Sequence, residues 1–140
     1  MDFYGFYTGK IFDAYKYLGA HVEEKGVTFR TFAPSASRIT LIGEFNNWQE
    51  WEMNKVSDGN FWECYVPQAK AGQMYKYKIY ARNGNPVDHC DPYGFGMELR
   101  PSSASIIRDM SKYKFKDSQW LQSRSDCRKK PLNIYEIHFG

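Results

Sequence analysis

The stretch GEFNNWQEW, from Gly43 to Trp51, combines two tryptophans, two adjacent asparagines and two glutamates. A sugar presents flat patches of C–H groups bordered by hydroxyl groups. A protein that binds it needs an exposed aromatic ring with hydrogen-bond donors and acceptors around the rim. Trp48 is the candidate ring, and Asn46 and Asn47 are the candidate hydrogen-bonding groups. Residues of these types would suit such a surface.

A later stretch, MYKYKIYA, supplies a candidate cation for the same surface. Its apolar and charged residues alternate, with Tyr75 and Tyr77 on one face and Lys76 and Lys78 on the other. A period of two is the signature of a strand with one buried and one solvated side. Lys76 is thus expected on the solvated face of a sheet.

Each candidate also has a purely structural interpretation. Trp48 would equally pack over a sheet edge or onto another domain, and Lys76 would be a solvated lysine. Asparagine tolerates left-handed backbone and bonds its own turn, so we expect Asn46, Asn47 or both to shape the turn. Trp51 is a secondary candidate, which either extends the aromatic surface or covers the core.

The elements that must position these residues are mostly short strands. Apolar, β-branched and aromatic runs divided by turn signals predict strands in VTFRTFAP, RITLIGEF, FWECYV, MYKYKIYA, PVDHCDP and SASIIRD. Trp62 shares a strand face with Cys64 and Val66, so we expect it to be buried. Near the N-terminus, Thr8 is a candidate N-cap and Gly19 a stop signal, which predicts a short helix between them.

This pattern predicts an all-β fold, an immunoglobulin-like β-sandwich with a short N-terminal helix and a C-terminal linker segment. After Asp109 the chain becomes polar and basic, and it then ends on the apolar run LNIYEIHFG. We interpret that run as the first strand of a further domain that lies beyond this sequence. The predicted organisation is a helical lead-in at 1–20, the sandwich at 21–110, a linker at 111–133 and the strand at 134–140.

Composition excludes several other classes of protein. The 140 residues suit one compact domain, and the net charge of +3 comes from interspersed acidic and basic residues. A nucleic-acid partner is not expected, since the clusters KYKFK and RKK are better explained by a solvated linker. Charged residues interrupt any apolar run long enough for a signal peptide or a membrane span, so we expect a cytoplasmic protein with no membrane partner.

No cofactor or metal site is expected either. The three cysteines are far apart and form no CxxC pair, which argues against a disulfide framework and a zinc site. The consecutive residues His89, Cys90 and Asp91 would alternate between the faces of a strand and would not converge on one ion.

Several motifs resemble one known family. GEFNNW, at 43–48, is similar to the GxFNxW turn of family 48 carbohydrate-binding modules, and YKYKI matches the YKY strand that follows it. DPYGFGMELRPSSAS, at 91–105, resembles a run found in 1,4-α-glucan branching enzymes. AYKYLGAHVEEKGVTFRTFAP, at 14–34, resembles the opening of the bacterial branching enzymes, and IYEIHFG resembles the first strand of their catalytic barrel.

The resemblance implies that Trp48 and Lys76 line a binding site for an α-1,4-glucan such as glycogen or a maltooligosaccharide. It also implies a parent enzyme that transfers glucan segments to 6-hydroxyl groups with an Asp nucleophile and a Glu acid/base. Those carboxylates belong to later barrel strands, so these 140 residues are expected to be catalytically inert. Strong starch binders of the family carry a second stacking tryptophan after the YKY strand, whereas this chain has RNGNPVDHCDP there.

The missing second tryptophan leads us to expect weak binding, with a dissociation constant near millimolar, about −4 kcal/mol. The alternative function is that of a structural domain that docks on the catalytic barrel of its own chain and has no affinity for sugar. The two functions are not exclusive.

Overall fold

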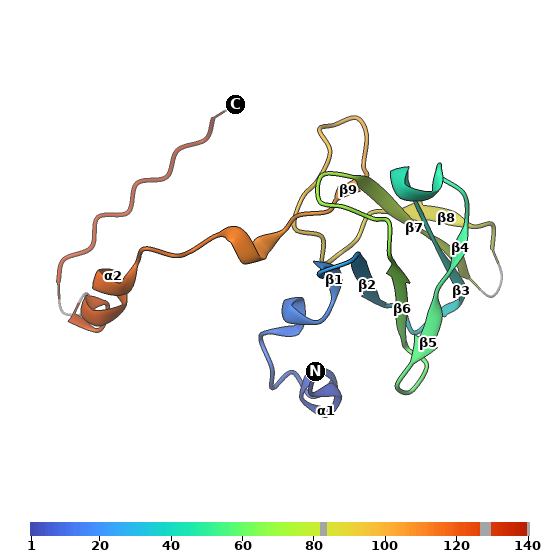
Figure 1. Ribbon diagram of the computed structural model, residues 1–140. Helices are drawn as coiled ribbons and strands as arrows, with labels where there is room; N and C mark the ends of the chain where they lie inside the picture. The colour runs from blue at the N-terminus through green and yellow to red at the C-terminus, as the bar shows by residue number, and fades with distance from the viewer. Residues whose placement is uncertain (82–83, 127–129, 140) are drawn as a thin grey trace. The chain divides into compact units, whose positions relative to one another are not determined.

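The computed structural model describes residues 1–81, 84–126 and 130–139. The chain forms two compact units, Met1–Asp109 and Met110–Gly140. The first unit is built from two antiparallel sheets that face each other (Figure 1). Within the described part of the chain, no helix has the length and apolar character needed to cross a bilayer.

The first sheet has four strands in the order β1-β2-β6-β5. Their bounds are Gly19–Val22 for β1, Val27–Phe32 for β2, Asn54–Val56 for β5 and Phe61–Val66 for β6. The second sheet has the order β4-β3-β7-β8, and β9 also pairs with β7. Their bounds are Ala36–Gly43 for β3, Trp51–Glu52 for β4, Met74–Ala81 for β7, Val87–His89 for β8 and Ser105–Ile106 for β9. The prediction of an all-β sandwich is confirmed.

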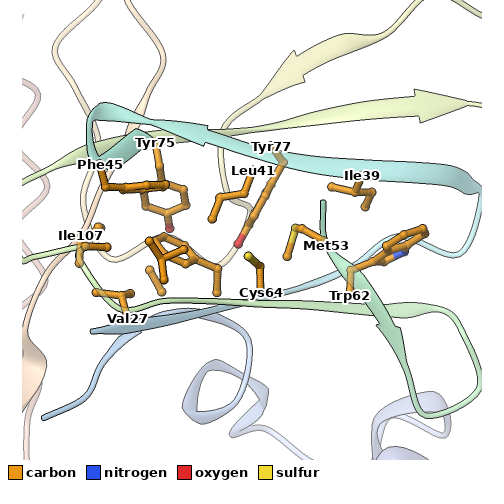
Figure 2. Packing of buried hydrophobic residues seen from close by; sticks show 14 of the residues in the cluster. Val27, Ile39, Leu41, Phe45, Met53, Trp62, Cys64, Tyr75, Tyr77 and Ile107 are labelled. Carbon is orange, nitrogen blue, oxygen red and sulfur yellow. The ribbon is translucent and has the colours of Figure 1, made fainter. Parts of the chain in front are cut away.

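The core lies between the two sheets, as Figure 2 shows. On β7, Tyr75 and Tyr77 are fully buried whereas Lys76 is half-buried, so the predicted alternation of this strand is confirmed. Phe29 of the first sheet contacts Tyr75 of the second with ring centroids 4.9 Å apart. Trp62 is buried as predicted, because its strand turns it into this layer.

The N-terminal helix lies earlier than the sequence predicted. Helix α1 spans Phe3–Tyr7, and the Asp2 side chain caps it by accepting a hydrogen bond from the Gly5 amide at 2.9 Å. Thr8 therefore ends this helix instead of beginning one, and the prediction of a helix starting after Thr8 is wrong. The 3-10 turn η1, Ala14–Lys16, is the helical piece that follows.

Aromatic packing explains why the helix forms where it does. Phe3 and Phe6 of α1 contact Phe61 of β6 with ring centroids 4.8 and 5.4 Å apart. The Tyr7 hydroxyl donates to Asp58 at 2.6 Å. Since Phe61 belongs to the face of β6 that points away from the core, α1 covers the outer surface of the first sheet. Helix α1 therefore belongs to the same compact unit as the sandwich.

The second unit contains the 3-10 turn η3, Met110–Lys112, and helix α2, Ser118–Ser123. Helix α2 falls inside the predicted linker, so that segment is not uniformly extended. Residues 130–139 form no strand in the described structure. A strand there would need a pairing partner, so the predicted barrel strand at 134–140 stays a prediction.

Candidate functional site

The candidate site begins at the turn that follows β3. The 3-10 turn η2, Glu44–Asn46, leads into Asn47 and Trp48, whose φ angles of 54° and 59° both lie in the left-handed region. Asparagine adopts this conformation readily, but a bulky residue such as tryptophan does so rarely. The Trp48 amide donates to the Gly43 carbonyl at 2.8 Å, which closes the turn. Trp48 keeps 42% of its surface exposed.

Asn46 builds this turn. Its side-chain oxygen accepts from the Gly43 amide at 2.9 Å, and its side-chain nitrogen donates to the Leu41 carbonyl at 3.2 Å. A Cβ at Gly43 would lie 2.7 Å from the Met74 carbonyl oxygen, so the close approach of β3 and β7 requires glycine at this position. The expectation that at least one asparagine shapes the turn is confirmed for Asn46.

Asn47 differs from its neighbour. Its backbone turns the chain, whereas its side chain is exposed and makes no hydrogen bond to the rest of the described structure. Of the two asparagines, Asn47 is therefore the one with an amide available to a ligand.

Lys76 lies at the same end of the sheet. It is paired with Ile42 across the β3–β7 ladder, and the next pair is Gly43 with Tyr75, where the Trp48 turn departs. Lys76 makes no hydrogen bond or ion pair with any residue in the described ranges. The structure thus brings Trp48, Asn47 and Lys76 to one end of the sheet formed by β4, β3, β7 and β8.

Trp51 is placed differently. In the β3–β4 ladder it lies opposite Leu41, which points into the core. Directly opposed residues share a face of the sheet, so Trp51 is on the core side of the edge strand and Lys76 is on the outer side. Of the two interpretations of Trp51, this register favours the one in which it covers the core, although Trp51 keeps 36% of its surface exposed and is not among the buried core residues.

Glu50 was not identified from the sequence as a site residue. Its carboxylate accepts from the Tyr80 hydroxyl at 2.9 and 2.8 Å, from Lys78 at 3.2 Å and from the Thr40 hydroxyl at 3.2 Å. Arg38 forms a further ion pair with it at 3.4 Å. The Tyr80 hydrogen bond, more than any other interaction, lowers the pKa of Glu50 below its ordinary value. This network joins the segment after Trp48 to β3 and β7.

A second polar cluster supports β7 from the core side. Asp91 is 3% exposed, and its carboxylate accepts from the hydroxyls of Tyr75 at 2.6 Å and Tyr77 at 3.1 Å, and from the Tyr93 amide at 2.8 Å. The Asp91 amide donates to the Ser105 hydroxyl at 2.8 Å. Burial raises the pKa of Asp91. This cluster fixes the start of the 91–105 segment and is closed to solvent.

The described residues contain no group of three or more His, Cys, Asp or Glu side chains that could hold a metal ion. Asp91 in particular is directed at buried tyrosines rather than at its neighbours His89 and Cys90.

A β-sandwich that holds an exposed tryptophan on a hydrogen-bonded turn, at the same sheet end as a lysine with no side-chain partner among the described residues, has the features of a carbohydrate-binding module. Comparison with known families agrees. Residues 17–94 match carbohydrate-binding module 48 (isoamylase N-terminal domain), and the chain belongs to this family. A module of this family is not itself a catalytic domain.

The curated relatives are branching enzymes. The chain is 38% identical over 143 residues to the 1,4-alpha-glucan branching enzyme GlgB of Fusobacterium nucleatum, a match that covers 100% of the chain and 23% of the relative. It is 39% identical over 142 residues to the enzyme of the same name from Dechloromonas aromatica, covering 98% and 23%. The chain therefore spans less than a quarter of the length of these relatives.

Solved structures share the fold at low sequence identity. A pullulanase from Anoxybacillus sp. LM18-11, complexed with maltotetraose, aligns with a TM-score of 0.61 and 22% identity over 75% of this chain and 15% of that one. A putative alpha amylase from Salmonella typhimurium aligns with a TM-score of 0.59 and 19% identity over 74% and 17%. These similarities show the fold alone.

Proposed function

We propose that the chain is the α-glucan-binding module of a 1,4-alpha-glucan branching enzyme, and that it positions glycogen chains or maltooligosaccharides for a catalytic barrel in the same protein. The observation that carries this proposal is the exposed Trp48 on its left-handed turn, at the same sheet end as Lys76, whose side chain has no partner in the part of the chain that the structure describes. The family membership and the relatives' names support the glucan as ligand and the branching enzyme as parent.

In this proposal the indole of Trp48 stacks on the apolar face of a glucose unit. Lys76 offers three N–H donors and Asn47 offers an amide, and both reach the hydroxyl groups at the rim of the sugar. Asn46 is withdrawn from the predicted ligand set because the turn uses both of its polar groups. Trp51 contributes by supporting the edge of the sheet.

Binding at a single site should be weak. One aromatic surface and a few hydrogen bonds, each worth about 0.5–1.5 kcal/mol net, correspond to a dissociation constant near millimolar. A polymer such as glycogen offers many binding positions, and a second contact through the barrel would raise the effective concentration. The module therefore functions best when it is tethered to the enzyme.

The transfer reaction belongs to the proposed parent protein. Its Asp nucleophile and Glu acid/base would lie on barrel strands beyond these 140 residues, and no residue of this chain is assigned to catalysis. A cytoplasmic location is part of the proposal.

Affinity electrophoresis tests the proposal. The wild-type chain should be retarded in a native gel that contains glycogen and should migrate normally in a gel that contains a soluble β-1,4-glucan. Trp48→Ala should migrate normally in both gels. Equal migration of wild type and variant in the glycogen gel would argue against the proposal.

A second candidate function, docking on the barrel without affinity for sugar, is favoured by the surface of the 91–105 segment. Leu99 is 90% exposed, although hydrogen bonds between Glu98 and Ala104 hold its neighbourhood in place. Met97 of the same segment is also exposed, and two exposed apolar side chains on one held segment suit a contact with another domain. The test is a variant of the full-length parent enzyme from which residues 1–110 are deleted. If this variant stayed folded and fully active, the docking function would be excluded.

A further inference from the structure

Glu50 joins three parts of the sheet that carries the candidate site. Both of its carboxylate oxygens accept from the Tyr80 hydroxyl, and Lys78 and Thr40 each donate to one of them. Tyr80 and Lys78 belong to β7, Thr40 belongs to β3, and Glu50 itself follows Trp48 by one intervening residue. The network thus reaches from the Trp48 segment to the two central strands.

A single exposed ion pair adds little to stability because solvent screens it and side-chain entropy opposes it. The Glu50 contacts differ from a single ion pair. Besides the two cations Lys78 and Arg38, the neutral hydroxyls of Tyr80 and Thr40 also donate to the Glu50 carboxylate. Arg38 also stacks over the Tyr80 ring, 4.5 Å from its centroid, and donates to Glu52 at 2.8 Å. Each member is therefore oriented by more than one neighbour.

The segment that contains Trp48 is consequently fixed at both ends. On one side the Trp48 amide is bonded to Gly43 at the end of β3. On the other side Glu50 is bonded to β3 and β7. A tryptophan held in this way loses little freedom when a ligand stacks on it, and pre-ordering of this kind increases affinity without adding a contact.

The network also separates the roles of two lysines on one face. Lys76 and Lys78 alternate with the buried tyrosines and both point outward, yet Lys78 is occupied by Glu50 while Lys76 has no partner within the described structure. The Glu50 carboxylate thereby assigns Lys78 to the scaffold and leaves Lys76 for the sugar.

We propose that Glu50 is a positioning residue of the glucan site, which orders the Trp48 segment and sequesters Lys78 without touching the sugar. This inference rests on the proposed function, because it concerns the same site. It adds a residue for which the binding motif gives no indication.

Isothermal titration of maltoheptaose into the 140-residue chain tests the proposal with three variants. Glu50→Ala removes the carboxylate that accepts from Tyr80, Lys78 and Thr40, and it should weaken binding about five- to tenfold, the loss expected when a held side chain becomes free to move. Glu50→Gln keeps one acceptor and should restore affinity to an intermediate value. Glu52→Ala is the matched control, since it removes a carboxylate bound to Arg38 on the same face and should leave affinity within about twofold.

Thermal unfolding gives the melting temperature of each variant. Titrations run well below all of these temperatures compare folded proteins, so a loss of affinity reports positioning rather than general instability. If Glu50→Ala does not fold, Tyr80→Phe replaces it, since this change removes the hydroxyl that bonds both Glu50 oxygens and keeps the ring under Arg38. Affinity of Glu50→Ala or Tyr80→Phe equal to that of Glu52→Ala would overturn the inference. If the wild type itself bound no maltoheptaose, the proposed function would fail as well, so the two failures are distinguishable.

Discussion

The amide of Trp48 donates to the carbonyl of Gly43 at 2.8 Å, and this bond holds a tryptophan in left-handed backbone at the end of a central strand. Strained conformations of this kind persist where the surrounding structure fixes them, and they are common at ligand sites. Here the side chain of Asn46 and the Glu50 network provide the fixing contacts. The turn thus explains how a short polar sequence presents a large ring to solvent.

Asn47 should be replaceable by glycine but not by alanine. Its φ of 54° is left-handed, and for most residues with a Cβ that conformation costs about 1–2 kcal/mol. We expect Asn47→Ala to lower the free energy of unfolding by about 1 kcal/mol and Asn47→Gly to leave it nearly unchanged. Urea denaturation of both variants measures this difference. Equal stabilities would contradict the left-handed turn.

Lys76 should matter for binding, whereas a lysine away from the sheet should not. We expect Lys76→Met to weaken maltoheptaose binding about three- to tenfold, because a charged donor to the sugar is lost. The matched control is Lys70→Met, which removes the same charge from an exposed turn. Titration calorimetry at the same ionic strength compares the two variants. A similar loss in both would mean that net charge, not the position of Lys76, governs binding.

Asp91 should make stability depend on pH. Burial raises its pKa above the ordinary value of 3.8, so its contribution to stability is full below that value and is lost as pH rises through the folded pKa. Asp91→Asn cannot titrate. We therefore expect the unfolding free energy of wild type relative to Asp91→Asn to fall as pH increases from about 3 to 7. Denaturation curves across this range would contradict the account if the difference were constant or rose.

The cysteines should differ sharply in reactivity. Burial raises the pKa of the Cys64 thiol to about 11, so at pH 8 about one thiol in a thousand is ionised, whereas Cys90 is half-exposed. In a Cys127→Ser background, which removes a residue outside the described ranges, we expect Cys90 to be alkylated first and Cys64 to react after denaturation. Mass spectrometry of peptides during iodoacetamide treatment follows both. Faster labelling of Cys64 would show that the core is open.

The strands of the fold were predictable because their signals are local. The alternation in β7 and the turn residues around β6 identify both strands, and the burial of Trp62 follows from its position in β6. The helix was misplaced because its residues are selected by contacts with Phe61, which lies far away in the sequence. The apolar residues after Thr8 have a spacing similar to that of a helix, but in the described part of the chain none of them makes a ring contact with Phe61.

The site was predictable in part for a similar reason. Trp48, Asn46 and Asn47 share one turn, so the sequence alone brings them together. The face occupied by Trp51 depends on the register between β3 and β4, and the role of Glu50 depends on the pairing of β3 with β7. Neither register is visible in the sequence. The signal for Glu50 lies in the outward positions of two strands, and it becomes apparent only after those strands are aligned.

The central claim is that Trp48 is the surface on which an α-glucan stacks, and calorimetric titration of maltoheptaose measures it most directly. Three proteins are compared: the wild-type chain, Trp48→Ala, and Trp120→Ala, which removes an exposed indole from α2 in the other compact unit. The account predicts saturable binding near millimolar for wild type and Trp120→Ala and no measurable binding for Trp48→Ala. Identical heats for wild type and Trp48→Ala would contradict it.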